Sequence, residues 1–502
     1  MSSSQRRFTV FRKHHSQHKK VSKSVHFNIQ YLKEQFGDSS DLSVRNLTIA
    51  EHGNAAIIHI QGIVDEQSLH DNVLHPILAF IYEKKYVHSG KLPEEITQII
   101  SVSKINLMNE WPEIVDNLLG GDTVILIEGH SEAIIAGTRK IQSRSITEPT
   151  TQTVIKGPKD GFTENLGTNI SLIRSRIQNN KLRIEQTKAG KVTKTNIGIL
   201  YMEGIADKDI VREVKMRISK IDIDSILDTN YVEEVIKDNR KTIFPLFQSS
   251  ERPDVVSANL LEGKIAIIIQ GTPFALILPA LLIQFFHSPE DYYANYLVSS
   301  FLRIIRIGSF YVNMYASAIY LALITHHHGL IPTTLMVTLM AQREQVPFPA
   351  IVELLLMELA FEVLREAGIR MPRAIGPAVS IVGALILGQA AVEAGFVSAA
   401  IVIIVATTAI SSFTLPNPNI VNTARGLRFI VIFAAAFIGF YGIILVSLCI
   451  ILHLCSLKSV GVPYFAPFSP VRFSDLKDSL IRIGSPSLLK RPSGSNRSNK
   501  VN

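Results

Sequence analysis

Residues 343–368 read REQVPFPAIVELLLMELAFEVLREAG and lead into further long apolar segments. Four polar side chains lie within these apolar runs: Glu358, Glu362, Gln389 and Glu393. A carboxylate at membrane depth costs at least about 2.5 kcal/mol, so such groups usually face the interior of a helix bundle or a water-filled path. The stretch therefore predicts a helical membrane domain, with conduction, transport or sensing as the leading functions.

The apolar residues are unevenly spread along the chain. Its 502 residues have a net charge of +8 and a mean hydropathy of +0.23, which is high for a soluble protein. The sequence before about Glu262 is polar with mixed charge, whereas long apolar runs dominate from Leu297 to Leu457. A soluble part followed by a membrane part is therefore predicted.

Both ends of the chain are basic. The first residues, MSSSQRRFTVFRKHHSQHKKVSKS, lack the apolar core of a secretory signal, so the soluble part is expected to stay in the cytoplasm. Solvated disordered tails and contact with anionic lipid head groups both fit this composition. The two cysteines, Cys449 and Cys455, match no metal-site spacing and are expected to be packed in the interior.

Two blocks of the soluble part occur twice. The block at residues 56–77 returns at 197–218, and the block at 116–137 returns at 258–279, with the same separation between blocks in both copies. Chance similarity rarely preserves a spacing in this way. Each copy has the pattern of a β-rich run ending in glycine, a helical segment, and two β-rich runs joined by a glycine turn. Two small α/β domains in tandem are predicted.

The duplication also affects the membrane prediction. Residues 264–286, KIAIIIQGTPFALILPALLIQFF, are apolar enough to be taken for a membrane helix. Their counterpart in the first copy is bracketed by charge, so we interpret Ile265 to Ile277 as the closing hairpin of the second domain. Ala280 to Phe286 would then lie at the membrane interface. Between the copies, Arg174 and Arg176 are expected on a solvated helix face, with anion or partner binding as the alternative.

The predicted organisation has five parts. They are a basic disordered tail at 1–25, a first cytoplasmic α/β domain at 26–150, its duplicate at 151–286, a helical membrane domain at 287–457, and a cytoplasmic segment with a disordered basic end at 458–502.

Six apolar segments are candidate membrane helices. They span residues 309–325, 330–341, 350–364, 375–394, 396–415 and 427–454. Several are shorter than the ~20 residues of a straight crossing, so tilted or re-entrant pieces are expected. The distribution of lysine and arginine leaves five or six crossings open.

Helical spacing places Glu358 and Glu362 on one face together with Arg365 and Glu366. Glu362 can pair with Arg365 three residues on, so a structural salt bridge and an ion-lining role are both open. On the next segment, Gln389 and Glu393 are the more plausible water-facing groups. Small residues form a stripe there that permits close helix packing within the chain or between protomers: Gly376, Ser380, Gly383, Ala391 and Ala394.

No reaction or cofactor can be assigned from motifs. The sequence lacks a GxxxxGK[ST] loop and the HExxH, GxSxG and GxGxxG patterns, so an enzyme is not expected. Three consecutive histidines, His326 to His328, cannot all ligate one ion without strain, and a membrane-surface loop is expected in place of a metal site.

Four long blocks carry a family resemblance: residues 156–177 (KGPKDGFTENLGTNISLIRSRI), 251–293, 330–395 and 461–482. They resemble the A subunit of the GerA-type spore germinant receptors of Bacillus and Clostridium relatives. The likeness covers roughly residues 150–485. One position departs from the family pattern, which has an acidic residue before LIPT where this chain has Gly329, so no ion role is assigned to that loop.

The resemblance implies a multi-pass protein of the spore inner membrane. It would act with a multi-pass, nutrient-binding B subunit and a lipoprotein C subunit, and no nucleic-acid partner is expected. It would also form a ring-shaped oligomer, for which the family suggests a pentamer, and open a path for monovalent cations when nutrient binds.

Two other functions remain open. A non-conducting scaffold could couple the nutrient-binding subunit to another channel. A secondary transporter would need repeats within the membrane part, whereas the repeat found here lies in the soluble part.

Overall fold

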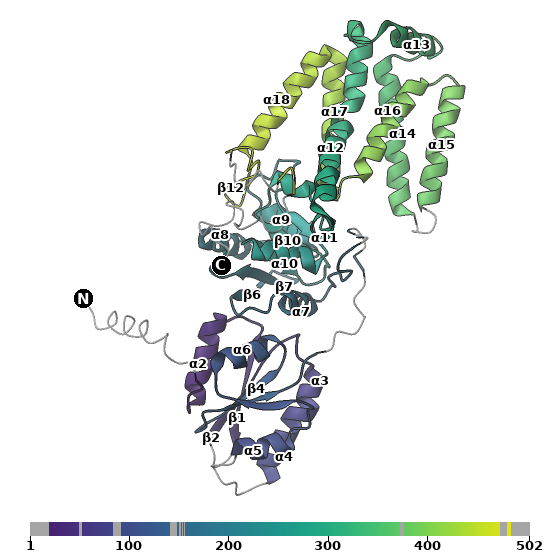
Figure 1. Cartoon of the computed structure of the whole chain (residues 1–502). Helices are drawn as coiled ribbons and strands as arrows, with labels where there is room; N and C mark the ends of the chain where they lie inside the picture. The colour runs from purple at the N-terminus through teal and green to yellow at the C-terminus, as the bar shows by residue number, and fades with distance from the viewer. Residues whose placement is uncertain are drawn as a thin grey trace, which may run out of the picture.

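A computed structural model describes residues 20–49, 53–83, 92–140, 148, 149, 152, 154, 156–371, 376–471 and 479–482 (Figure 1). Two α/β units follow one another along the chain, and a long bundle of helices rises from the second unit. The observed architecture is therefore α/β followed by a helical region, as predicted.

The first α/β unit contains a five-stranded sheet with strand order β1-β2-β4-β5-β3, in which all neighbours are antiparallel. Its elements are α2 (Val25–Phe36), β1 (Leu42–Ile49), β2 (Gly53–Ile60), α3 (Glu66–Leu69), the π-helical turn η2 (His70–Leu74), α4 (His75–Glu83), α5 (Leu92–Ile99), β3 (Ile105–Met108), α6 (Trp111–Leu119), β4 (Thr123–Ile127) and β5 (Ala133–Ala136).

The second α/β unit repeats this topology with strand order β6-β7-β9-β10-β8. Its elements are α7 (Leu166–Arg176), β6 (Leu182–Ala189), β7 (Thr195–Met202), α8 (Lys208–Ser219), α9 (Thr229–Ile236), β8 (Gln248–Ser250), α10 (Pro253–Leu261), β9 (Ile265–Ile269) and β10 (Ala275–Leu278). The apolar run that begins at Ile265 is thus a hairpin, as the repeat predicted.

In each copy, a buried asparagine in the first helix fixes the segment before that helix through the same pair of hydrogen bonds. The amide of Asn28 bonds both the N–H and the carbonyl of Ser22, at 2.9 and 2.6 Å. The amide of Asn169 does the same to Thr163, at 2.7 and 2.5 Å. Because the same contacts recur, the duplication extends to buried polar contacts as well as to strand order.

Helices cover both faces of each sheet. In the first unit, alternate residues of β2 and β4 pack against α3 to α5 on one face and against α2 and α6 on the other. In the second unit, one face packs against α7 and α10. Its other face belongs to a core that continues without a break into the bundle, from Ile267 through Phe285 to Val431. The second unit and the bundle are therefore joined by a shared apolar core.

The two α/β units meet at a buried ion pair. Arg174 on α7 contacts Asp41 of the first unit at 2.8 Å, with side-chain exposures of 0% and 4%. Beside it, the Ser40 N–H donates to the carbonyl of Ile184, on the free edge of β6, at 2.9 Å. The predicted solvated position of Arg174 is therefore wrong, because this arginine holds the two units together. Arg176 lies nearer the surface and pairs with Asp160 at 2.5 Å.

The link from β10 to the bundle, which the sequence predicts to lie at the membrane interface, packs into the shared core. Residues Leu282–Phe286 form a short 3₁₀ helix, η3, whose Ile283, Phe285 and Phe286 are buried in the shared core. A short helix, α11 (Glu290–Tyr293), follows and leads directly into the bundle.

The remaining elements form the bundle and a short hairpin after it. They are α12 (Tyr296–Thr325), the 3₁₀ turn η4 (His328–Leu330), α13 (Thr333–Arg343), α14 (Ala350–Arg370), α15 (Gly376–Glu393), α16 (Ala399–Phe413), α17 (Pro418–Ile438), α18 (Phe440–Ser456), β11 (Lys458–Ser459) and β12 (Val462–Pro463).

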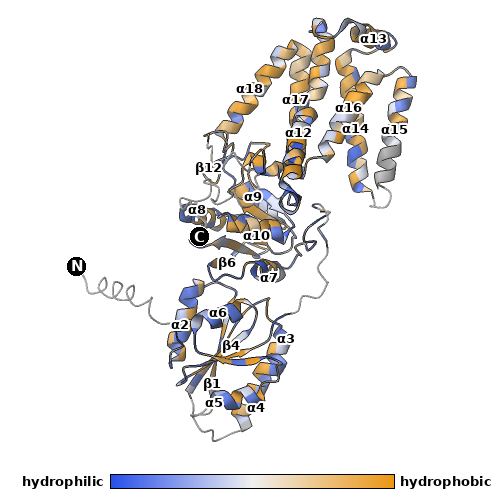
Figure 2. Ribbon diagram, in the orientation of Figure 1, coloured by the Kyte–Doolittle hydropathy of each residue, from blue (hydrophilic) through white to orange (hydrophobic). Residues whose placement is uncertain are grey.

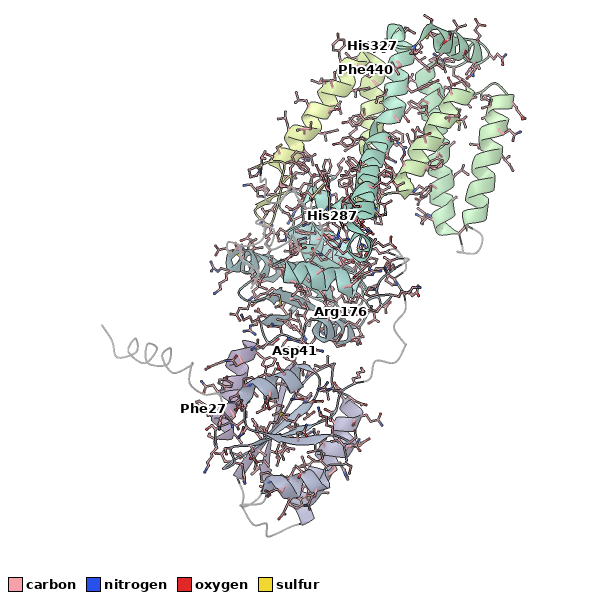
Figure 3. All side chains as sticks on the ribbon, in the orientation of Figure 1. Phe27, Asp41, Arg176, His287, His327 and Phe440 are labelled. Carbon is pink, nitrogen blue, oxygen red and sulfur yellow. The ribbon has the colours of Figure 1, made fainter. Side chains whose placement is uncertain are left out.

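The predicted single segment at 427–454 is in fact two helices. The chain reverses at Gly439, whose φ of 64° and ψ of −138° favour glycine strongly. A Cβ atom there would lie 2.6 Å from the His327 ring. Figure 3 places His327 and Phe440 together at the end of the bundle away from the α/β units. The bundle therefore contains one more helix than the apolar runs indicated.

Two helices in the described part of the chain are long and apolar enough to cross a membrane, namely α12 and α17. Helices α16 and α18 are apolar but shorter. Figure 2 shows hydrophobic residues around most of the bundle, while the helices of the α/β units carry many hydrophilic ones. The two cysteines lie on the exposed surface of α18, so their predicted interior packing is wrong.

Candidate functional site

A cluster of four charged side chains lies inside the bundle between α14 and α17. Glu358 and Glu362 stand one helical turn apart on α14, and Arg425 and Arg428 stand three residues apart on α17. The cluster lies at mid-height, because Arg428 is at the centre of its helix. It contains two carboxylates and two guanidinium groups, so its charges balance.

Glu358 is the most deeply placed carboxylate of the cluster. Its side chain is 0% exposed and lies 3.2 Å from Arg428, which is 2% exposed. Ser317 on α12 donates a hydrogen bond of 2.7 Å to Glu358. Two interior charges become tolerable when they pair and when further hydrogen bonds satisfy them.

Glu362 lies nearer the edge of the cluster and bonds both arginines. Its Oε1 accepts from Arg428 and from Arg425, each at 2.9 Å, and its Oε2 makes a second contact with Arg425. The Glu362 side chain is 15% exposed and that of Arg425 is 25% exposed. The predicted pairing of Glu362 with Arg365 is therefore replaced by pairing across helices.

Neighbouring helices complete the shell around Arg428. Thr408 on α16 accepts a hydrogen bond from Arg428 at 3.1 Å, and its carbonyl accepts one from Asn313 on α12 at 2.9 Å. Helices α12, α14, α16 and α17, all in the bundle of Figure 1, thus contribute polar groups to one centre. Carboxylates and arginines that pair between helices in this way can hold the helices in one register. They can also exchange partners when the helices move.

The other predicted polar pair lies apart from this cluster. Gln389 and Glu393 are exposed on α15 and bond to each other at 2.8 Å. The structure therefore brings Glu358 and Glu362 together but leaves Gln389 and Glu393 on an outer helix.

The stripe of small residues is only partly described. Gly383 faces α14, where an added Cβ would lie 3.0 Å from Leu364. Ala391 is half-buried and Ala394 is exposed, while the surroundings of Gly376 and of the Ser380 side chain are not among those described. Gly383 thus allows close packing within the chain.

The two arginines of the site were not predicted as part of it. Arg425 and Arg428 are among the basic residues whose distribution leaves five or six crossings open. Their spacing in an otherwise apolar segment was a signal that they share a helix face and require acidic partners there. Glu353, nearer the start of α14, is also buried and accepts a hydrogen bond from the Ser398 N–H.

The second α/β unit contacts the same helix that carries these arginines. Thr423 on α17 donates to the carbonyl of Ile243, in the loop between α9 and β8, at 2.8 Å. In the same loop, Thr242 lies 3.0 Å from Nε2 of His453 on α18. Displacement of this loop would therefore act directly on α17, less than two turns from Arg428.

No group of three or more His, Cys, Asp or Glu side chains in the described ranges is arranged to hold a metal ion. The contacts described above are ion pairs and hydrogen bonds.

A model of the Bacillus/Clostridium GerA spore germination protein family matches residues 30–494. The chain belongs to this GerA family. The match begins within α2 and includes the rest of both α/β units and the whole helical bundle.

Several relatives share most of this GerA-family chain. Spore germination protein KA of Bacillus subtilis (strain 168) is 46% identical over 96% of this chain and 88% of its own length. Spore germination protein A1 of the same organism is 36% identical over 91% of this chain and 94% of its own length. A third relative, the uncharacterized membrane protein YfkQ of Bacillus subtilis (strain 168), is 39% identical over 96% of this chain and 94% of its own length.

A crystal structure of the N-terminal domain of the A subunit of the Bacillus megaterium spore germinant receptor GerK3 is 34% identical in sequence. The matched region covers 53% of this chain and 98% of the crystallised domain, with a TM-score of 0.41. Family membership supports a role in spore germination.

Proposed function

We propose that this chain is a membrane subunit of a nutrient-sensing spore germinant receptor and forms an oligomeric, ligand-gated channel for monovalent cations. The observation that carries this proposal is the balanced charge cluster at mid-height in a bundle whose helix α17 is also bonded to the second α/β unit. Charges at such a depth are expensive and usually functional. A contact from outside the bundle gives a means of moving them.

The topology we propose has six crossings. Helices α12, α14, α15, α16, α17 and α18 would cross, and α13 would lie at the far surface. The direction of the chain alternates between successive long helices, and α12 begins at the same end of the bundle where α18 finishes (Figure 1). An even number of crossings would put both α/β units and the C-terminal segment on the same side of the membrane. We propose that this is the cytoplasmic side of the spore inner membrane.

The proposed partners follow from the family. They are a multi-pass B subunit that binds the nutrient, a lipoprotein C subunit, and further copies of this chain, with a pentamer as the proposed assembly. We also propose the predicted domain boundaries, which divide the chain after residues 25, 150, 286 and 457.

Within this channel, two sets of residues would have different roles. Gln389 and Glu393 are exposed on α15 and would line the cation path in the oligomer. Glu358 and Glu362 would act at the gate, where a change of partner between carboxylates and arginines shifts the helices. Gly383 would allow α15 to approach its neighbours closely. We propose the same packing role for Gly376, Ser380, Ala391 and Ala394.

The test is potassium release from spores whose only germinant receptor contains this chain, across a panel of amino acids, sugars and nucleosides. Glu362→Gln is expected to slow release because it weakens the pairing with Arg425 and Arg428, without loss of assembly. Glu393→Gln is expected to slow release because it removes a charge from the path. The matched control is Glu366→Gln, on the same helix as Glu362, which breaks a surface pair with Arg370.

Assembly is measured on the same spores by detergent extraction and cross-linking. Normal release from both Glu362→Gln and Glu393→Gln would remove these residues from the path and the gate. Release that is unaffected by deletion of the whole chain would contradict the receptor role itself.

One observation favours a second function, a non-conducting scaffold that couples the nutrient-binding subunit to another channel. Glu358 is fully buried and paired, which is what a purely structural carboxylate would show. A scaffold would oligomerise yet give no cation flux in liposomes under any activation, and this distinguishes it from the channel.

A further inference from the structure

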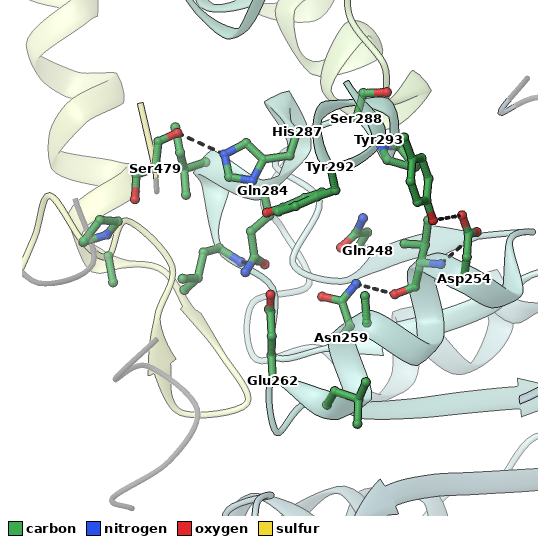
Figure 4. A pocket seen from close by; sticks show the side chains of 18 residues that line it. Gln248, Asp254, Asn259, Glu262, Gln284, His287, Ser288, Tyr292, Tyr293 and Ser479 are labelled. Carbon is green, nitrogen blue, oxygen red and sulfur yellow. Dashed lines mark hydrogen bonds between the residues drawn. The ribbon is translucent and has the colours of Figure 1, made fainter. Parts of the chain in front are cut away.

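A cavity of about 430 Å³ lies where the second α/β unit, the linker into the bundle and the C-terminal segment meet. Figure 4 shows this cavity, with Asn259 and Asp254 on one side and His287 and Ser479 on another. Its wall comes from three stretches that are distant in sequence: β8 with α10, the η3–α11 linker, and residues 466, 467 and 479. The volume falls within the range of about 300–1,000 Å³ that small-molecule sites occupy.

The charged groups at this cavity already have partners. Asp254 pairs with Arg252 at 2.7 Å and accepts a hydrogen bond from the Tyr293 hydroxyl at 2.8 Å. Lys264 donates to the lining residue Asn259 at 2.5 Å; burial lowers the pKa of Lys264 to about 8, and the charge of Glu262 partly opposes that shift. A charged ligand would lose its hydration without gaining an unpaired counter-charge, which is unfavourable.

The polar groups that remain available are uncharged. The Oε1 of Gln284 accepts from the Leu281 N–H at 3.1 Å, so its amide NH₂ is the group left to donate. Among the residues that the structure describes, the Gln248 side chain has no hydrogen-bond partner, and its amide can both donate and accept.

His287 adds an acceptor to this set. A carbonyl oxygen can only accept, so the contact of 3.0 Å between His287 Nε2 and the Ser479 carbonyl places the ring hydrogen on Nε2. Burial, with the nearby charge of Arg303, lowers the pKa of His287 to about 3. The ring is therefore neutral at physiological pH, and no donor among the described residues bonds the lone pair of its Nδ1.

Two tyrosines and several aliphatic side chains supply the apolar surface. Tyr292 and Tyr293 are consecutive on α11, and both line the cavity (Figure 4). Val255, Leu261 and Ile283 contribute aliphatic surface. Flat aromatic rings are well accommodated by tyrosine faces, through offset or edge-on packing.

We propose that this cavity binds an uncharged heteroaromatic small molecule that has hydrogen-bond donors and acceptors on its edge. The rings would pack between the tyrosines and the aliphatic wall, and the edge would bond Gln248, Gln284 and His287. This site is separate from the proposed cation path, and its existence does not depend on channel activity.

The position of the cavity gives the ligand a regulatory role. Helix α11 is followed almost at once by α12, and Ser300 on α12 accepts a hydrogen bond of 3.0 Å from the N–H of Arg482 in the C-terminal segment. A ligand that bridges α10, α11 and this segment would favour one geometry at the base of α12. The ligand would shift the bundle toward one conformation only if it binds that geometry of α12 more tightly than other geometries.

The test is isothermal titration of the full chain in nanodiscs with three probes of similar size: adenine, phenethylammonium and benzoate. Adenine is uncharged and carries both donors and acceptors, whereas the other two are a cation and an anion. We expect saturable binding of adenine, with the two charged probes at least tenfold weaker.

Two variants locate the site. Ala258→Phe fills the cavity from an exposed position of α10 and is expected to weaken adenine binding at least tenfold. Gln248→Leu removes one neutral hydrogen-bonding group and is expected to weaken binding about fivefold. The matched control, Met216→Phe, adds an aromatic ring to the exposed surface of α8 outside the cavity and should bind as the parent does.

Absence of saturable adenine binding to the parent chain would overturn the proposal. Equal or tighter binding of either charged probe would overturn the uncharged class, and binding that Ala258→Phe leaves unchanged would overturn the location.

Discussion

Arg428 and Glu358 are both buried in the bundle, and each makes the other tolerable there. An isolated charge in a medium of low dielectric constant loses several kcal/mol of hydration, which a close partner and further hydrogen bonds offset. Glu362, Ser317 and Thr408 provide these additional bonds. The identities of the side chains are therefore mutually dependent, and no single member of the cluster can be interpreted alone.

The neutrality of His287 gives a pH-dependent prediction. The folded ring has a pKa of about 3, whereas an unfolded histidine takes up a proton near pH 6.5. The unfolded state therefore binds more protons between these values, so stability is lost as the pH falls from about 6.5 toward 3. We expect the parent chain to lose up to about 2 kcal/mol more than His287→Gln between pH 7 and pH 5.

Unfolding of the full chain in detergent at both pH values measures this difference. His26→Gln, at an exposed position of α2, is the control and should follow the parent. If the stability of the parent and of His287→Gln changes equally with pH, the His287 ring does not contribute to the pH dependence of stability.

The turn between α17 and α18 depends on one glycine. Gly439 occupies a backbone conformation that costs other residues about 1–3 kcal/mol, and an added Cβ would contact the side chains of His326 and His327. Both effects act on the point where the chain reverses. The two helices therefore pack against each other only because a residue without a side chain lies between them.

Gly439→Ala is expected to lower the melting temperature of the full chain in detergent. The matched control is Gly426→Ala in the middle of α17, where an added Cβ meets nothing within 4 Å. Alanine favours a helix over glycine by about 1 kcal/mol, so this control should be neutral or slightly stabilising. Equal effects of the two substitutions would contradict the role assigned to Gly439.

The complete molecule is held together by two different kinds of junction. The second α/β unit and the bundle share a continuous apolar core, while the two α/β units meet around the buried pair Arg174–Asp41. A polar junction of this kind depends on both partners. Loss of one leaves a buried charge, which typically costs about 3–5 kcal/mol.

Arg174→Met is therefore expected to lower the melting temperature of the α/β region and to increase cleavage by protease between the two units. The matched control is Arg176→Met on the same helix, because Arg176 and Asp160 are 28% and 25% exposed. A surface pair of this kind is worth at most about 1 kcal/mol. Scanning calorimetry and limited proteolysis of the full chain compare the two variants, and similar behaviour would argue against a special role for Arg174.

Much of the fold could be predicted because it depends on local patterns. The matched blocks at 56–77 and 197–218 predicted two α/β units of the same kind, and the charge around the first copy indicated that Ile265 begins a strand. The division at Gly439 was not predicted, because the flanking residues are uniformly apolar and a glycine is also compatible with a continuous membrane helix.

Sequence alone was sufficient to identify the duplicated α/β part, the apolar helical part and the family, because repeats, hydropathy and long motifs are properties of contiguous residues. It also identified the acidic residues Glu358 and Glu362. Their partners on α17 are more than 60 positions away, and hydrogen bonds at that separation depend on how helices pack. The cavity beside His287 likewise arises only where three distant stretches meet, so no contiguous pattern could reveal it.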